Sequence, residues 1–202
     1  MTNKTKSKTN AKVVKKDFYI VGIGVSAGGL EALEAFFSSC PHDTGIAFVI
    51  VQHLSPDYKS MMASLLARHT KMPIKVSDDT DIIKPNHIYL IPGNKNLIVK
   101  NGRLELVDRA HANQLNLPID LFFESLAVEK KENAIGIILS GTGSDGTRGG
   151  KAIKAAGGAI FVQDPETIRF DGMPLSAIEN GCLLYTSPSP RDLSTSRMPS
   201  SA

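Results

Sequence analysis

The chain has 202 residues, of which 42% are apolar and 21% charged, with no tryptophan. This ordinary composition excludes collagen-like, wholly disordered and disulfide-stapled chains. No apolar run approaches the roughly 20 residues that span a bilayer, and the N-terminus lacks the apolar segment of a secretory signal. The two cysteines, Cys40 and Cys182, have no metal-site spacing. We therefore expect a cytoplasmic protein with no metal.

The positive charge is concentrated at the N-terminus. Residues 1–16 hold six lysines and no acid, and without them the net charge of +3 becomes −3. Because this charge lies on an arm, we expect no basic nucleic-acid face. We predict a disordered Lys-rich arm over 1–16, a folded domain over 17–182, and a tail over 183–202. The tail holds six Ser, three Pro and two Thr without periodicity, which is typical of a linker or a non-native extension.

Apolar runs alternate with helical patterns along the domain. Runs at 18–24, 46–51, 134–139 and 159–162 predict buried strands, and apolar spacing at 29–37, 57–69, 118–129 and 147–156 predicts helices. This alternation predicts an α/β domain: a doubly wound, mainly parallel sheet with helices on both faces. Residues 87–91 and 97–107 alternate as strands do, and Asn101-Gly102 is a two-residue turn signal. We expect an antiparallel hairpin there, near one edge of the sheet.

A glycine-rich segment, Gly22–Gly29 (GIGVSAGG), joins the first strand to the first helix. Its glycines resemble a dinucleotide-binding loop, which makes a nucleotide-cofactor oxidoreductase one alternative. Gly24-Val-Ser26-Ala-Gly28 also fits the G-x-S-x-G turn that exposes a nucleophilic serine. A third interpretation is a tight turn in which glycines only permit close packing.

The end of the next strand favours the serine. A dinucleotide site wants an acid there to bind the ribose, but this strand ends Val51-Gln52-His53. Alone, His53 could be a structural histidine. Because adjacent parallel strands end at one crevice, Ser26 and His53 are expected to meet there as a nucleophile and its base.

A second glycine-rich loop, Ser140–Gly146 (SGTGSDG), follows the strand at 134–139. Ser144 or Asp145 could simply cap the next helix. A phosphate cradle is disfavoured because the loop lacks the Gly-Lys-Ser/Thr ending. In the third interpretation Asp145 orients the imidazole of His53. The order Ser, His, Asp differs from that of α/β-hydrolases.

Five ordered motifs together closely resemble the catalytic domain of CheB-type protein-glutamate methylesterases, which act on chemotaxis receptors. They are GIGVSAGGLEAL, VQHLSPD, YLIPGNKNL, LSGTGSDGTRGGKAIKAAGG and VQDPETIRFDGMPLSAI, and they span about residues 18–181. The resemblance implies a parallel α/β sheet with a hairpin near one edge. It also implies that Ser26, His53 and Asp145 form a catalytic triad, without a cofactor.

The resemblance further implies hydrolysis of glutamyl methyl esters on methyl-accepting receptors, releasing methanol, with deamidation of glutamine as a related activity. The backbone N–H groups of Ala27 and Thr142 would hold the oxyanion, and Met173 would contact substrate. Methyl-accepting receptors are the expected partners, with a fused or separate receptor methyltransferase as a second partner; no nucleic acid or membrane insertion is expected. Only the Lys-rich arm precedes the domain here, so control by a phosphorylated receiver domain is not expected. The alternative outside enzymology is a domain that only docks receptors.

Overall fold

Six parallel pairings build the central sheet of this chain. The computed structural model describes residues 17–52, 61–109, 115–182 and 185–186. Within them, the sheet has seven strands in the order β10-β9-β8-β1-β2-β5-β3. The strands are β1 (Ile20–Val25), β2 (Ala47–Gln52), β3 (Ile74–Val76), β5 (Ile88–Leu90), β8 (Ala134–Ile138), β9 (Ala159–Val162) and β10 (Tyr185–Thr186). The predicted parallel sheet is confirmed.

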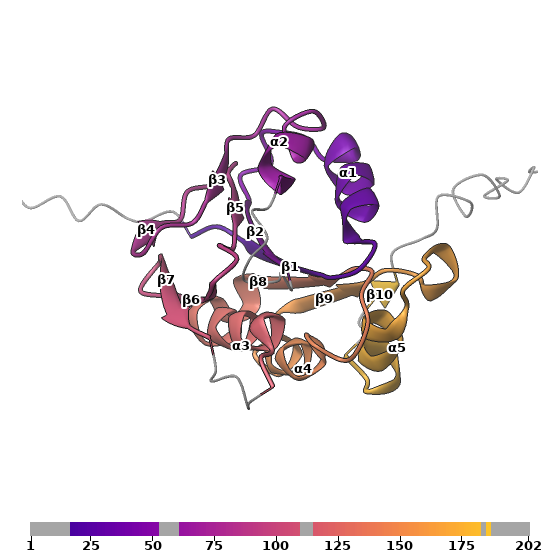
Figure 1. Cartoon of the computed structure of the whole chain (residues 1–202). Helices are drawn as coiled ribbons and strands as arrows, with labels where there is room; N and C mark the ends of the chain where they lie inside the picture. Colours follow the sequence, from indigo (N-terminus) through magenta and orange to yellow (C-terminus); the bar gives the residue numbers. More distant parts are fainter. Residues whose placement is uncertain (1–16, 53–60, 110–114, 183–184, 187–202) are drawn as a thin grey trace, which may run out of the picture.

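Helices cover both faces of this sheet (Figure 1). They are α1 (Gly29–Ser39), α2 (Met62–Leu66), α3 (Pro118–Lys130), α4 (Thr147–Ala155) and α5 (Gly172–Glu179), with single 3-10 turns at Lys131–Asn133 and Pro165–Thr167. Of the helix predicted over 57–69, only Met62–Leu66 is helical among the described residues. Helix α5 was not among the predicted helices, since Gly172 and Pro174 lie in its first turn.

The chain winds outward in opposite directions from the middle of the sheet. It runs from β1 through α1 to β2 on one side, and from β8 through α4 to β9 on the other. Strands β1 and β8 are direct neighbours. The crevice beyond their carboxyl ends is therefore the switch point, where open α/β sheets bind ligands.

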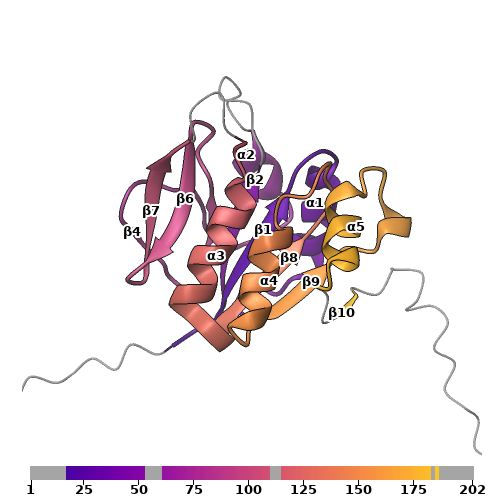
Figure 2. The same cartoon turned by 90° about the horizontal axis from the view of Figure 1, so that it is seen from below.

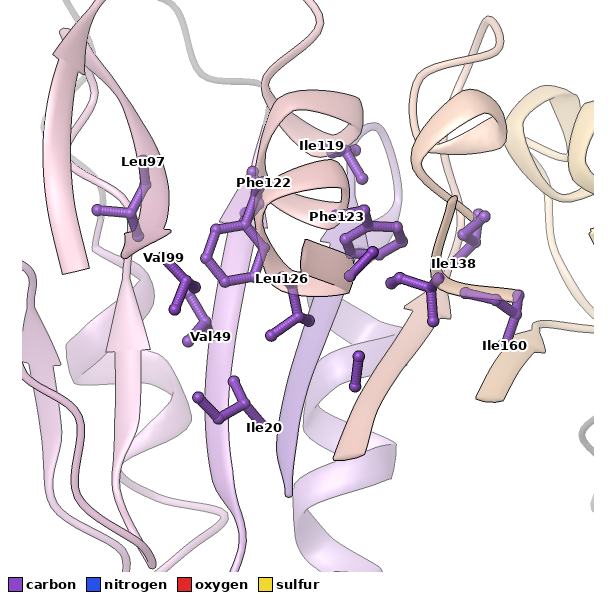
Figure 3. Close-up of a cluster of buried hydrophobic side chains, with 14 of the residues drawn as sticks. Ile20, Val49, Leu97, Val99, Ile119, Phe122, Phe123, Leu126, Ile138 and Ile160 are labelled. Carbon is purple, nitrogen blue, oxygen red and sulfur yellow. The ribbon is translucent and has the colours of Figure 1, made fainter. Parts of the chain in front are cut away.

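Side chains of the strands alternate between two hydrophobic clusters, as the period of two requires. Along β2, Phe48 and Ile50 pack toward α1 and α2, whereas Val49 and Val51 pack toward α3. Figure 3 shows the second cluster, in which Phe122 and Phe123 of α3 lie over the sheet. Both rings are fully buried.

The predicted hairpin is present, and its surroundings differ from a simple edge insertion. Strands β6 (Lys95–Lys100) and β7 (Arg103–Asp108) are joined at Asn101-Gly102, where both residues have positive φ. These two strands form a separate three-stranded sheet with β4 (Asp81–Ile82), in the order β4-β7-β6. The predicted strand at 87–91 is not part of it, because it corresponds to β5, which runs parallel to β2 in the main sheet.

Helix α3 joins the two sheets, and Figure 2 shows it between the hairpin and the main sheet. The Glu129 carboxylate accepts from the N–H groups of Asn101 and Gly102 at 3.1 and 2.7 Å. Ser125 Oγ accepts from the Val99 N–H at 3.0 Å. These hydrogen bonds are directional, so they fix the position of the hairpin along the helix, which nondirectional apolar contacts would not do.

Candidate functional site at the switch point

Ser26 lies directly beyond β1, in the turn that leads to α1. Its N–H donates to the Ser140 carbonyl at 3.0 Å, and its carbonyl accepts from the Gly29 N–H at 3.1 Å. Gly28 has φ 69°, in the left-handed region that favours glycine. The turn leaves Ser26 half-buried, so the residue is held firmly at the switch point and remains accessible.

The loop after β8 lies directly against this turn. A Cβ on Gly141 would stand 2.9 Å from the Ser26 Cβ and 2.3 Å from the Met173 Sδ. The Ser140 hydroxyl, which is 1% exposed, lies within hydrogen-bond distance of the Ala27 and Phe170 carbonyls, at 2.8 and 3.2 Å. One buried serine therefore connects the two glycine-rich loops to the segment that follows β9.

The backbone N–H groups of the two glycine-rich loops differ in whether they are hydrogen-bonded. The N–H of Ser26 is bonded to Ser140, and that of Gly141 donates to the Phe170 carbonyl at 2.8 Å. Within the described part of the chain, the N–H groups of the next residues, Ala27 and Thr142, have no acceptor. These are the two groups that the family resemblance implies would hold an oxyanion, and such donors stabilise developing negative charge.

Asp145 is buried, and its carboxylate caps a helix other than the one it precedes. Its two oxygens accept from the N–H groups of Ile119 and Asp120, in the first turn of α3, at 3.1 and 2.9 Å. One alternative from the sequence was that Ser144 or Asp145 caps the next helix, α4. The N-cap residue of α4 is Gly146, and no side chain caps this helix. Asp145 is 4% exposed.

Burial, with a smaller contribution from the nearby charge of Asp120, raises the pKa of Asp145 to about 6, against the lowering effect of backbone N–H groups, chiefly those of Asp120 and Ile119. A carboxyl group poised near neutrality at a crevice is typical of functional sites. The two N–H donors leave lone pairs on the carboxylate, so it can accept one more hydrogen bond.

His53 lies outside the described residues. Gln52, the last described residue of β2, is the register partner of Val25 at the end of β1. Ser26 and His53 are the next residues in the two sequences. This register agrees with the expectation that both belong to the same crevice.

Met173 differs from the expectation of a substrate contact. Its side chain is 1% exposed and packs under Gly141, and its N–H donates to the Gly141 carbonyl at 2.9 Å. Its position makes it a support for the loop that carries Thr142.

A cavity of about 480 Å³ opens beside the serine turn, between α1 and the segment after β9. Gly28 and Ser140 form its inner end, Glu31 and Arg169 contribute opposite charges, and Phe170 supplies an apolar wall. The Arg169 guanidinium lies 5.5 Å from the Phe170 ring centroid. The cavity is large enough for side chains of a bound polypeptide.

The glycines that suggested a dinucleotide loop have another use. A Cβ on Gly22 would stand 2.9 Å from ring atoms of Phe122 and Phe123, and one on Gly24 would stand 2.5 Å from Ile119 Cγ2. These two glycines let α3 lie close to the sheet, which accounts for the G-x-G spacing without a pyrophosphate. Among the described residues no group of His, Cys, Asp and Glu could hold a metal ion.

Ser140, Phe170 and Asp120 contribute to the site but were not singled out by sequence. Phe170 acts through its carbonyl, and Ser140 through a hydroxyl that bonds other loops, so neither leaves a signal in its own segment. Asp120 did leave one, because it is a lone acid among the apolar residues of a helix start (PIDLFF).

The fold is a doubly wound α/β domain, with a serine turn and a buried carboxylate at its switch point. A family model described as CheB methylesterase matches residues 21–193. The chain therefore belongs to the CheB methylesterase family. In the described part of the chain, no helix is both long and apolar enough to cross a membrane.

Several known proteins are similar to this chain. The crystal structure of the Thermotoga maritima CheB methylesterase catalytic domain has a TM-score of 0.77 and 31% identity, and the match covers 84% of this chain and 92% of that one. A protein-glutamate methylesterase/protein-glutamine glutaminase from Thermotoga maritima is 32% identical over 173 residues, which are 84% of this chain and 50% of that protein. An uncharacterized 104.1 kDa protein of Rhodobacter capsulatus is 48% identical over 120 residues, which are 59% of this chain and 12% of that protein. The chain thus spans about half the length, or less, of the curated relatives it matches.

Proposed function

We propose that this chain hydrolyses glutamate methyl esters on methyl-accepting chemotaxis receptors, releasing methanol, and that it also deamidates glutamine side chains at such sites. The names of its relatives include both activities. The observation that supports the proposal is the close contact between Ser26 and Gly141, in two loops whose Ala27 and Thr142 N–H groups have no acceptor in the described structure.

In the proposed reaction, His53 removes the proton of Ser26 while the hydroxyl oxygen attacks the ester carbonyl. The N–H groups of Ala27 and Thr142 hold the negative charge on the carbonyl oxygen. His53 then protonates the departing methoxide, which leaves as methanol. Water, activated by the same imidazole, attacks the acyl-serine and releases a glutamate side chain. Asp145 keeps the imidazole in the required orientation and tautomer.

In this reaction no atom changes its oxidation state, so its steps balance without a metal or organic cofactor. The bond from Ser26 Oγ to the carbonyl carbon forms first, and the C–O bond to methoxide breaks when the tetrahedral intermediate collapses. In hydrolysis the hydroxyl of water bonds to the acyl carbon, the bond to Ser26 Oγ breaks, and His53 returns the proton to that oxygen. For a glutamine side chain the leaving group is ammonia in place of methanol. The cavity beside the serine is the proposed binding region for neighbouring side chains of the receptor helix.

The decisive experiment measures methanol released from receptor methylated with a labelled methyl group. The wild-type chain should release label, and Ser26→Ala should lose nearly all release while unfolding at the same urea concentration as the wild type. Ser144→Ala is the matched control, because Ser144 is an exposed serine of the facing loop. Wild-type turnover by a folded Ser26→Ala variant would reject the proposal.

The same preparation separates the docking alternative. A domain that only docks receptors would bind receptor-containing vesicles without releasing label, and Ser26 would not react with a serine-directed phosphonate. An enzyme of the proposed kind should be labelled at Ser26, and Ser26→Ala should abolish that labelling.

A further inference from the structure

Helices α3 and α4 exchange their N-terminal caps. Neither Leu117, the N-cap of α3, nor Gly146, the N-cap of α4, makes a side-chain cap of its own. Asp145, which precedes α4, accepts from the first turn of α3. In return Asp120, in the first turn of α3, accepts from the Gly149 N–H of α4 at 2.8 Å. Figure 2 shows the two helices side by side.

The exchange is held at close range by packing. Asp120 is 2% exposed, so this residue is at least as completely removed from water as Asp145, which is 4% exposed. A Cβ on Gly149 would stand 2.5 Å from the Phe123 Cβ and 2.8 Å from the Asp120 carbonyl oxygen. A larger residue at this position could not pack so closely, so Gly149 allows α4 to lie directly against the first turn of α3.

The charged groups around the two carboxylates come from α3, α4 and the residues after α5. Glu124 lies one turn along α3 from Asp120, and Arg148 of α4 bonds it with Nε 2.5 Å from Oε1. Electrostatic interactions link Arg148 to both Asp120 and Asp145. Beyond α5, the Cys182 thiol interacts with Asp120 and bonds the Thr147 carbonyl. Arg148 is therefore the cation that partly balances the pair.

We propose that Asp120 is a positioning residue for the hydrolytic reaction, which fixes the Asp145 carboxylate through the exchanged caps and opposes its negative charge. This inference rests on the proposed function, in which Asp145 must be ionised to orient His53. Burial raises the pKa of Asp120, with a further contribution from Glu124 against the lowering effects of the Gly149 N–H and Arg148. The charge of Asp120 in turn raises the pKa of Asp145.

Asp120→Asn is the informative variant, because it removes the charge and keeps an oxygen for the Gly149 N–H. We expect the acidic limb of the pH profile of kcat/KM to move down by about one pH unit, as loss of a neighbouring like charge allows. The plateau rate should stay within about threefold of wild type. Asp120→Ala also removes the acceptor of the Gly149 N–H, so kcat should fall about tenfold or more. The ratio of kcat in Asp120→Asn to kcat in Asp120→Ala then measures how much activity the remaining acceptor oxygen restores.

Two substitutions on α4 provide the controls. Arg148→Gln should move the acidic limb upward, because it removes the balancing cation. Lys151→Gln removes an equal charge from the same helix, where Lys151 bonds Asn180, and should leave the limb unchanged. A limb that stays at its wild-type position in Asp120→Asn would overturn the proposal, as would equal losses of rate in Asp120→Asn and Asp120→Ala.

Carboxyl-carbon NMR of Asp145 gives a readout that does not depend on turnover. Its titration midpoint should fall in Asp120→Asn and rise in Arg148→Gln. A wild-type protein that releases no methanol but shows these shifts would refute the proposed function and leave the coupling of the two carboxylates standing. If the protein is active but the titration midpoint of Asp145 is the same in wild type and in Asp120→Asn, the positioning role alone would be refuted.

Discussion

Replacing Asp145 by asparagine should make the stability of the chain change differently with pH. The folded pKa of this carboxyl is about 6, against a usual 3.8. Between these values the folded state binds more protons than the unfolded state, so wild-type stability falls as the pH rises. The shift of about two pH units corresponds to about 3 kcal/mol. Asparagine does not ionise, so this loss is absent in the variant.

The substitution also has a cost that is present at every pH. Asp145 accepts from two buried N–H groups of α3, and asparagine has one oxygen in place of two. Leaving one donor unpaired costs about 1–3 kcal/mol. Asp145→Asn should therefore be less stable than wild type by about that amount near pH 4. Near pH 7.5 the wild type has lost about 3 kcal/mol, which offsets this cost, so the variant should be as stable as wild type or up to about 2 kcal/mol more stable.

Urea unfolding at pH 4, 5, 6, 7 and 8 measures the difference. The free energy of unfolding of the variant, relative to wild type, should rise by about 2.5 kcal/mol across this range, with most of the change between pH 4 and 6. Parallel curves for the two proteins would refute the assignment of a raised pKa to Asp145. In the methanol assay the same variant should lose on the order of 10⁴-fold in rate, because asparagine favours the wrong imidazole tautomer.

Three further substitutions test the loops and the cavity. Gly24→Ala should cost about 1–3 kcal/mol, measured by urea unfolding, because its Cβ would stand 2.5 Å from Ile119 Cγ2; an unchanged midpoint would contradict the packing role. Ser140→Ala should cost about 1–3 kcal/mol and lower kcat, since the buried hydroxyl bonds two loops; full activity would argue against loop positioning. Arg169→Ala should raise KM for an acidic receptor helix about two- to fivefold at low salt with kcat unchanged; an unchanged KM would remove the cavity from the binding region.

Local patterns in the sequence were enough to predict the sheet and the position of its loops. Continuous apolar runs such as 46–51 correspond to buried strands, and the Asn101-Gly102 signal corresponds to a turn with two positive φ values. Both depend on residues that are close together in sequence. The two short strands β3 and β4 gave no such signal, since each has only two or three residues.

Contacts between distant segments could not be predicted in the same way. Asp145 was expected to cap α4 or to orient His53, and the second expectation involves a residue outside the described ones. In place of the cap on α4, its carboxylate accepts from N–H groups about 25 residues earlier in the chain. Met173 was expected to contact substrate, and its burial, which is possible because Gly141 leaves room for its sulfur, was not expected. Both outcomes depend on how α3 and α5 dock, which no single segment encodes.

Helix α3 acts as a strut between two places that are far apart. Its thirteen residues correspond to about 20 Å. At its C-terminal end, Glu129 accepts hydrogen bonds from the N–H groups of Asn101 and Gly102. At its N-terminal end, two backbone N–H groups donate to the Asp145 carboxylate. A displacement of the Asn101-Gly102 turn would therefore be transmitted to the Asp145 carboxylate through one continuous helix, with no loop between the two contacts.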